Sequence, residues 1–301
     1  MANTGWSAVA ALVGANLFWA GNYIVGQAAV TDIAPLSLVF LRWLIALVPL
    51  FLIAQTVERP DWRVVLRAWP RLAWLSVCGL LGYNAFLYTA LQHTDALNAS
   101  LINAFNPALI SLAALVFLRE RLDRAGLVGL GLALAGVLYV ISDGHPAALL
   151  KTGFGRGDLL MVGAITVWTV YTLSGRRPLP VPPITSTFAQ AVVTTVLAGL
   201  WVAGTGGATW PSGSQSWSAL LFIAVFPSVG SYLLWNYALR RLPAGRGGVF
   251  LNLITVFTAL FTILAGRPFS LAQLLGGAVI VVGVVLTNLR AFRPAGGPAP
   301  D

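Results

Sequence analysis

Ten apolar stretches, each about as long as a membrane-crossing helix, account for most of the chain and limit its fold more than any other feature. Charges, prolines or polar clusters bound them at about 6–28, 34–56, 69–91, 96–118, 124–142, 157–175, 182–204, 216–238, 244–265 and 271–290. About 20 apolar residues in a helix cross the roughly 30 Å hydrocarbon core of a bilayer. Barrel strands would be about half as long and would alternate in polarity. The sequence therefore predicts an all-α integral membrane protein with ten transmembrane helices.

The composition excludes a water-soluble fold. The chain is 58% hydrophobic and 9% charged, whereas soluble domains are about 25% charged. The net charge of +9 could suggest a nucleic-acid partner, but basic residues beside apolar spans are what membrane insertion requires, so no nucleic acid is expected. Cys78 lies within an apolar run and is interpreted as a small buried side chain. No removable signal peptide is expected before the first span.

The basic residues lie mostly on one side of the predicted spans. Lys151, Arg156 and Arg267 fall on one side, and fourteen arginines fall on the side of the two termini: Arg59, Arg63, Arg67, Arg71, Arg119, Arg121, Arg124, Arg176, Arg177, Arg240, Arg241, Arg246, Arg290 and Arg293. Cytoplasmic loops carry the excess of Lys and Arg. Both termini are therefore expected to be cytoplasmic.

An internal repeat relates the two halves of the chain. A shift of about 148 residues pairs Gly14 with Gly163, Trp19 with Trp168, Pro35 with Pro183, Arg42 with Gln190, Gly82 with Gly230, Gly129 with Gly276 and Gly136 with Gly283. Because each half has five spans, an odd number, the second half must enter the membrane from the opposite side. Inverted repeats often hold a midplane site and alternate its access. We predict repeats at 1–142 and 157–290, followed by a tail at 291–301. Duplication that only enlarged the bundle is the alternative.

Several motifs resemble one transporter family. They are Leu17-Phe18-Trp19-Ala20-Gly21-Asn22-Tyr23, the stretch from Pro35 to Leu41-Arg42-Trp43, Tyr88-Thr89-Ala90-Leu91, Pro107, and Leu118-Arg119-Glu120-Arg121-Leu122 followed by Gly129 and Gly136. Together they resemble the EamA-type branch of the drug/metabolite transporter superfamily over nearly the whole chain. Within it the chain is most similar to YddG-type amino-acid exporters of bacterial inner membranes. The resemblance implies five-helix inverted repeats, a central cavity, and substrates that include amino acids.

The second half departs from that family pattern at one place. Arg267-Pro268 stands where a glutamate like Glu120 is usual. Glu120 is therefore interpreted as a cytoplasmic helix-end residue rather than as one of a functional pair. Pro107, which follows Asn103 and Asn106, either breaks its helix beside a cavity or only kinks it. Two pairs of glycines seven residues apart, Gly129 with Gly136 and Gly276 with Gly283, are expected to allow close helix packing.

Arg42 is the one clear charge inside a predicted span. Charged groups in the membrane are rare and often functional. Its guanidinium could pair with the carboxylate of an amino acid through two hydrogen bonds. Alternatively, Arg42 is structural, and either bonds to helix carbonyls or extends toward the membrane surface. The sequence leaves both readings open.

Uncharged polar and aromatic residues at mid-span are the other candidates for substrate binding. The predicted set, with Arg42, is Asn16, Trp19, Tyr23, Tyr83, Asn84, Tyr88, Asn103, Asn106, Trp168, Tyr171, Gln190, Trp235, Asn236 and Asn252. Hydrogen bonds between helices explain any single asparagine equally well. An aromatic cavity with a few neutral polar groups suits a neutral, amphipathic or aromatic substrate.

The predicted function is secondary transport. All acidic residues, His93 and His145 lie at span ends or in loops, whereas proton-coupled pumps commonly use such groups inside the bundle. We expect a carrier that exports amino acids or related metabolites by alternating access, without an intramembrane carboxylate relay, cofactor or metal. Catalytic motifs are missing from the sequence, so no enzyme is expected. The alternatives are export of another metabolite or a drug-like cation, a channel, or a membrane enzyme. The expected partners are the substrate and the bilayer, and a monomer is compatible with the sequence.

Overall fold

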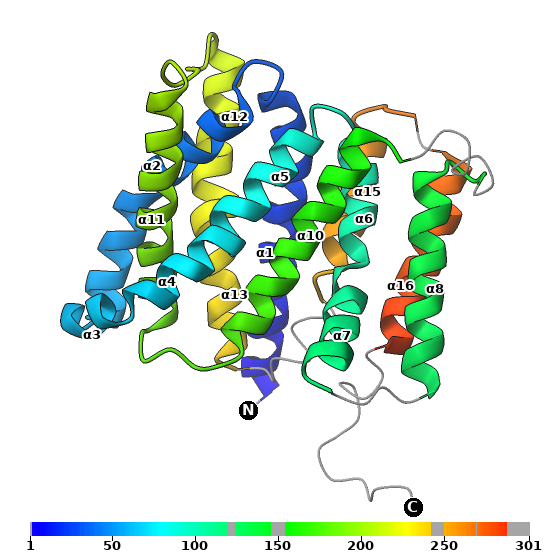
Figure 1. Cartoon of the computed structure of the whole chain (residues 1–301), viewed down its shortest axis with the longest axis horizontal. Coiled ribbons are helices and arrows are strands. Elements are labelled where there is room, and N and C mark those ends of the chain that lie inside the picture. Colours follow the sequence, from blue (N-terminus) through cyan, green and yellow to red (C-terminus); the bar gives the residue numbers. More distant parts are fainter. Residues whose placement is uncertain (1, 120–123, 146–153, 242–249, 269, 288–301) are drawn as a thin grey trace, which may run out of the picture.

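The protein is described here by a computed structural model covering residues 2–119, 124–145, 154–241, 250–268 and 270–287. Within these ranges its regular structure is helical, with no strand. The elements, three of them π-helical turns labelled η, are α1 (Ala2–Ala29), α2 (Pro35–Ile53), η1 (Ala54–Glu58), α3 (Trp62–Arg67), α4 (Trp69–Leu75), η2 (Ser76–Gly82), α5 (Tyr83–Ala90), α6 (Ala96–Ala104), α7 (Asn106–Phe117), α8 (Arg124–Ile141), α10 (Arg156–Gly175), α11 (Pro183–Gly204), α12 (Ser214–Val225), η4 (Phe226–Gly230), α13 (Ser231–Leu239), α15 (Leu253–Leu264) and α16 (Leu271–Thr287) (Figure 1).

The described helices include eight stretches that are long and apolar enough to cross a membrane. They are Trp6–Ala29, Pro35–Glu58, Trp69–Ala90, Ala96–Phe117, Arg124–Ile141, Arg156–Gly175, Pro183–Gly204 and Ser214–Leu239. These agree within a few residues with the first eight predicted spans. Two shorter apolar helices, Leu253–Leu264 and Leu271–Leu286, lie in the ranges predicted for the last two. The predicted spans also include 244–249 and 288–290, which are outside the described residues, as are Glu120 and the tail at 291–301. The chain is a multi-pass helical membrane protein.

Short polar residues and prolines set where several helices begin. The Asp61 carboxylate accepts the Arg63 N–H at 2.9 Å at the start of α3, and that of Asp95 accepts the Asn98 N–H at 2.8 Å at the start of α6. Such caps satisfy amide groups that have no partner within the helix. Pro35 and Pro183 begin α2 and α11, where a missing N–H leaves no helical hydrogen bond unmade.

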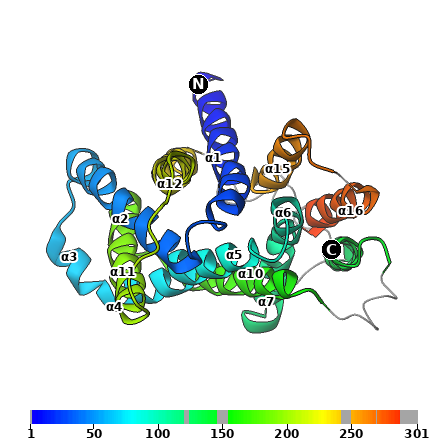
Figure 2. The ribbon, with the colours of Figure 1, turned by 90° about the horizontal axis from the view of Figure 1, so that it is seen from above.

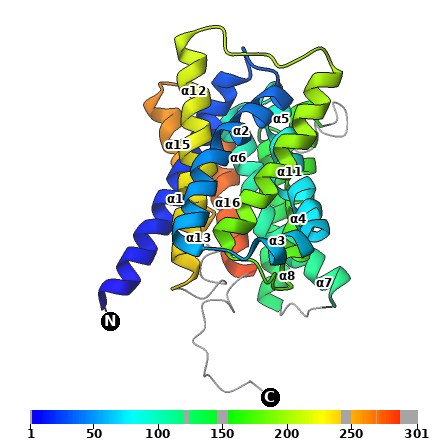
Figure 3. The ribbon, with the colours of Figure 1, turned by 90° about the vertical axis from the view of Figure 1, so that its left-hand side faces the viewer.

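The helices surround a central space between two groups (Figure 2). Seen from above, α1, α12 and α15 lie on one side and α5, α10 and α7 on the other, with α2 and α11 at one end and α16 at the other. Neighbouring pairs include α2 with α11, α8 with α16, α5 with α10, and α1 with α13. The start of α1 and the end of α16 lie at the same end of the molecule (Figures 1 and 3).

Helices α8 and α16 approach one another through glycines. A Cβ atom added to Gly283 would lie 2.4 Å from the Ala133 amide nitrogen and 2.6 Å from the Gly129 carbonyl oxygen. One added to Gly136 would lie 2.9 Å from the Gly276 carbonyl oxygen. The predicted role of these glycines in close packing is therefore confirmed.

We expect Gly283→Val to separate α8 from α16, because the new side chain meets backbone atoms that cannot yield. Overpacking of this kind destabilises by about 1–3 kcal/mol. The variant should therefore show a lower melting temperature in detergent than the wild-type protein. Gly131→Val is the matched control, since a Cβ there meets nothing within 4 Å. Equal melting temperatures for the two variants would contradict this account of the packing.

Candidate functional site

Two π-helical turns interrupt helices next to the central space. The turn η2 connects α4 to α5, and η4 connects α12 to α13. A π-helical turn inserts extra backbone into a helix and occurs frequently at functional sites. Tyr83 and Asn84 follow η2 directly, Ser228 lies within η4, and Tyr232 follows it. The two turns thus set where these polar side chains enter the middle of the molecule.

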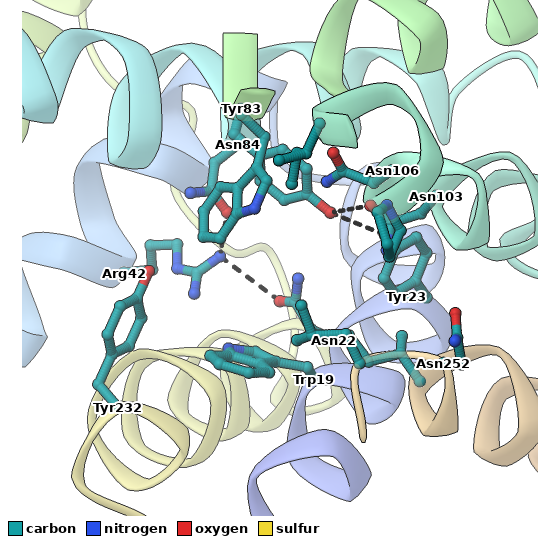
Figure 4. A pocket seen from close by; sticks show the side chains of 15 residues that line it. Trp19, Asn22, Tyr23, Arg42, Tyr83, Asn84, Asn103, Asn106, Tyr232 and Asn252 are labelled. Atoms are coloured by element: carbon teal, nitrogen blue, oxygen red, sulfur yellow. Dashed lines mark hydrogen bonds between the residues drawn. The ribbon is translucent and has the colours of Figure 1, made fainter. Parts of the chain in front are cut away.

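A cavity lies between the helices at this level. It has about 720 Å³ of space not filled by atoms, part of which is open to solvent. Its described lining residues are Trp19, Asn22, Tyr23, Arg42, Tyr83, Asn84, Asn103, Asn106, Pro107, Ile110, Trp168, Tyr232, Leu251, Asn252 and Ile254 (Figure 4). Small-molecule sites commonly combine apolar walls with a few polar groups in this way.

Arg42 lies at one side of the cavity and is 2% exposed. Its Nη1 donates to the Asn84 amide oxygen at 2.7 Å, to the Tyr88 hydroxyl, and to the Asn22 amide oxygen at 3.5 Å. Its Nε donates to the Ser228 hydroxyl at 2.9 Å. Arg42 therefore neither extends to the membrane surface nor bonds to helix carbonyls.

Among the described residues, one nitrogen of the Arg42 guanidinium has no hydrogen-bond partner, and no opposite charge lines the cavity beside it. Within the described ranges, Nη2 donates to no side chain or carbonyl, although the other two nitrogens do. Among the cavity-lining residues that the structure places there is no Asp or Glu. The site is therefore a buried cation held by neutral groups, and Nη2 is available to a ligand.

A second polar group lies across the cavity, where a helix is broken. The helix α6 ends at Ala104 and α7 begins at Asn106, and Pro107 has no N–H to give to the Asn103 carbonyl. The Asn103 amide oxygen accepts the Tyr83 hydroxyl at 3.1 Å, and that of Asn106 accepts the Thr169 hydroxyl at 3.3 Å. Of the two readings of Pro107, the structure therefore shows the break beside a cavity.

Asn252 adds an amide without a partner to this second group. Its side chain is buried, and neither its nitrogen nor its oxygen is hydrogen-bonded to any part of the chain that the structure describes. An unpaired buried amide is unfavourable by about 1–3 kcal/mol. Because Asn252 lines the cavity, a bound molecule could satisfy it.

Aromatic rings form the walls between these polar groups. The Trp19 ring lies 5.8 Å from that of Tyr232 and 5.5 Å from that of Trp235, measured between centroids. On the opposite wall the Trp168 ring lies 5.1 Å from that of Tyr83 and 5.0 Å from that of Tyr171. Such rings offer large apolar surfaces to an aromatic or aliphatic group.

The cavity continues toward the end of the molecule where α1 begins. A second hollow shares Trp19, Trp168, Tyr232 and Leu251 with it and extends to Pro178 and Pro183, between α10 and α11. Its walls also include Tyr171, Gln190, Trp235 and Asn236. We call this second hollow the vestibule. It gives the cavity a path to one face of the protein.

The opposite end of the molecule is held together by polar contacts between the two halves. Arg267 Nη1 donates to the Gln27 amide oxygen at 2.7 Å, and Gln273 Nε2 donates to the Asn98 amide oxygen at 3.1 Å. The Ser212 N–H donates to the Asp32 carboxylate at 2.8 Å and is the main cause that lowers the pKa of that group. A separate hollow at this end is lined by Gln27, Arg267 and Gln273 among others, and it shares no lining residue with the cavity or the vestibule.

The structure brings together most of the residues predicted from sequence. Nine of them line the cavity: Trp19, Tyr23, Arg42, Tyr83, Asn84, Asn103, Asn106, Trp168 and Asn252. Four others, Tyr171, Gln190, Trp235 and Asn236, line the vestibule. Tyr88 lies behind Arg42 and bonds to it. Asn16 lines neither hollow, since it is buried in α1 and its amide nitrogen donates to the Leu12 carbonyl at 2.7 Å.

Sequence reasoning missed Asn22, Tyr232 and Ser228. Asn22 is three residues from Trp19 and so shares its helix face, which was an available signal. The 148-residue shift pairs Tyr232 with Asn84, so the internal repeat was the available signal for Tyr232. Ser228 had no signal of its own, because its role depends on a contact with Arg42 that is 186 residues distant in sequence.

Comparison with known proteins places the chain in a family. Residues 6–142 and 155–289 match the EamA-like transporter family. The uncharacterized transporter YyaM of Bacillus subtilis is 28% identical over 71% of each chain. The aromatic amino acid exporter YddG of Ancylobacter novellus is 27% identical over 76% of this chain and 79% of its own. A probable terminal-alkyne amino-acid exporter of Streptantibioticus cattleyicolor is 27% identical over 95% of this chain and 94% of its own.

A solved crystal structure shares the fold. It matches 97% of this chain and 99% of its own length with a TM-score of 0.67, at 24% sequence identity. Its similarity extends across both halves of the helical bundle. The match over residues 6–142 and 155–289 shows that the chain belongs to the EamA-like transporter family.

Proposed function

We propose that this transporter exports amino acids, including neutral and aromatic ones, or closely related metabolites across the bacterial inner membrane by alternating access. The observation that carries the proposal is the buried Arg42 guanidinium, which faces an aromatic cavity without an opposite charge beside it. Two relatives whose names specify amino-acid export support the same substrate class.

A carboxylate is the ligand group that Arg42 lacks. Burying a cation among neutral groups is unfavourable, and an anion that hydrogen-bonds to it relieves this. Arg42 Nη2 could donate to the substrate carboxylate, while amide oxygens at the helix break accept from its ammonium group. The aromatic walls would then hold its side chain. Each part of an amino acid thus has a matching surface in the cavity.

A drug-like cation is the weaker alternative. It would enter a cavity that already carries the charge of Arg42, and the described lining offers no carboxylate to offset the repulsion. A channel or an enzyme is also less consistent with the family and with a central cavity that continues toward one face through the vestibule. We therefore propose a carrier.

The proposed architecture is ten membrane spans in two inverted repeats, 1–142 and 157–290. Helix contacts support it, because α5 packs on α10 as α13 packs on α1, and the pairs α2–α11 and α8–α16 join equivalent helices. The turns η2 and η4 end at Gly82 and Gly230, which the 148-residue shift makes equivalent. The family also matches the two halves separately.

The proposed orientation places the vestibule toward the cytoplasm. Figure 1 shows the start of α10 and the end of α15, which are next to Arg156 and Arg267, at the opposite end. It shows α3, the start of α4, the end of α7, the start of α8 and the ends of α10 and α13 at the vestibule end, and the arginines in or next to these segments are Arg59, Arg63, Arg67, Arg71, Arg119, Arg124, Arg176, Arg177, Arg240 and Arg241. Basic residues mark cytoplasmic loops. The structure would then be open to the inside, with both termini cytoplasmic.

We expect a cysteine at Asn236 in the vestibule to react with a membrane-impermeant maleimide only from the cytoplasmic side. The measurement compares inside-out with right-side-out vesicles in a Cys78→Ala background. Thr205→Cys, which is exposed at the other end, is the matched control and should react only from outside. Labelling of Asn236→Cys from outside alone would contradict the orientation.

We expect Arg42→Gln to raise the KM for amino-acid transport in liposomes about tenfold or more. A hydrogen bond to a charged group is worth about 1.5–3 kcal/mol, and 1.4 kcal/mol is about a factor of ten. Arg42→Lys keeps the charge but not the donor geometry, so its KM should lie between the values of the wild-type protein and Arg42→Gln. Size-exclusion profiles check that each variant folds. An unchanged KM in Arg42→Gln would show that Arg42 is structural.

We expect transport to continue without a proton gradient. The described cavity lining has no Asp, Glu or His, so the site holds no group that titrates near neutral pH. Uptake into liposomes should be driven by the amino-acid gradient or by exchange, with similar rates when the pH difference is collapsed by an ionophore. Strict dependence on the pH difference, abolished by one mid-span substitution, would contradict this.

A further inference from the structure

Ser228 holds Arg42 from the other half of the chain. Its hydroxyl oxygen accepts the Arg42 Nε–H at 2.9 Å, and the side chain is fully buried. The partners of Nη1, which are Asn22, Asn84 and Tyr88, belong to the first half. In the described part of the chain, Ser228 is thus the single hydrogen-bond partner that the second half offers to this guanidinium.

Pro227 explains why the Ser228 hydroxyl points as it does. Proline has no N–H, so Pro227 cannot donate to the carbonyl four residues earlier, that of Ile223. The Ser228 hydroxyl donates to this same carbonyl at 2.7 Å. A guanidinium can only donate, so Ser228 accepts the bond from Arg42, and its single hydroxyl hydrogen is directed to Ile223. By leaving the Ile223 carbonyl without a backbone donor, the proline thus favours the orientation in which the serine oxygen faces Arg42.

Two anchored nitrogens determine the plane of the Arg42 guanidinium. Asn84 and Tyr88 fix Nη1, and Ser228 fixes Nε. The group is planar and rigid, so anchoring two of its nitrogens also fixes the position of Nη2, on a residue that lines the cavity. Without the bond to Ser228, the side chain could rotate about the contacts of Nη1, and Nη2 would spend less time toward the substrate.

We propose that Ser228, oriented by Pro227, is a positioning residue for substrate binding that keeps Arg42 Nη2 directed at the substrate carboxylate. This inference rests on the proposed function, since it takes a carboxylate as the ligand of Arg42. It also links the carboxylate site in the first half to the π-helical turn η4 in the second half. The two halves thus build one binding group together.

The test measures the KM and maximal rate of amino-acid uptake by reconstituted Ser228→Ala protein. We expect the KM to rise about tenfold while the maximal rate stays within about twofold, because an anchor of a charged group is lost. Ser228→Thr keeps the hydroxyl and should return the KM toward the wild-type value. Pro227→Ala gives Ile223 a backbone donor and leaves Ser228 in place, so it should raise the KM by a smaller factor.

Ser231→Ala is the matched control. Ser231 is equally buried, and its hydroxyl donates to the Ala15 carbonyl at 2.9 Å without contacting Arg42. Its removal should leave the KM unchanged. An equal rise in this control would show a general packing effect and overturn the inference.

Two other results would also overturn the inference, and they separate it from the proposed function. An unchanged KM in Ser228→Ala, with saturable uptake by the wild-type protein, would remove the role of Ser228 alone. A lowered KM would show that Ser228 competes with the carboxylate for Nε. If the wild-type protein took up no amino acid, the proposed function would fail and this inference with it.

Discussion

A buried guanidinium held by neutral acceptors is the interaction on which the centre of this protein depends. Arg42 reaches the middle of the bundle and is kept there by Asn22, Asn84, Tyr88 and Ser228. A charge in this position would be strongly unfavourable without such partners. Four elements, α1, α2, α5 and η4, therefore have to meet at one point. Their meeting defines one side of the cavity and leaves Nη2 available.

The remaining cavity follows from irregularities in otherwise regular helices. Lipid requires that backbone groups bond within helices, so departures from helical geometry are tolerated where they face a cavity or other protein. The break before Asn106 and the turns η2 and η4 are such departures. Each places polar side chains toward the central space, while Trp19 and Trp168 supply the apolar walls. The proposed substrate is an amino acid because these surfaces match its three parts.

The sequence predicts the helices and most of the cavity residues because both depend on local patterns. Apolar length determines the spans, and helical spacing places Trp19 and Tyr23 together. Its position at mid-span also made Asn16 a candidate, but its amide nitrogen bonds within its own helix. What the sequence could not predict is contact between distant segments. Ser228 meets Arg42 only because α12 and η4 pack beside α2, and no local spacing encodes that arrangement.

The central claim is that Arg42 makes the cavity a binding site for a carboxylate. Calorimetric titration of the purified protein with an aromatic amino acid, and separately with the amine that lacks its carboxyl group, tests this most directly. We expect saturable binding of the amino acid that is at least about tenfold tighter than binding of the amine, because one hydrogen bond to a charged group is lost in the amine. Equal or tighter binding of the amine would contradict it.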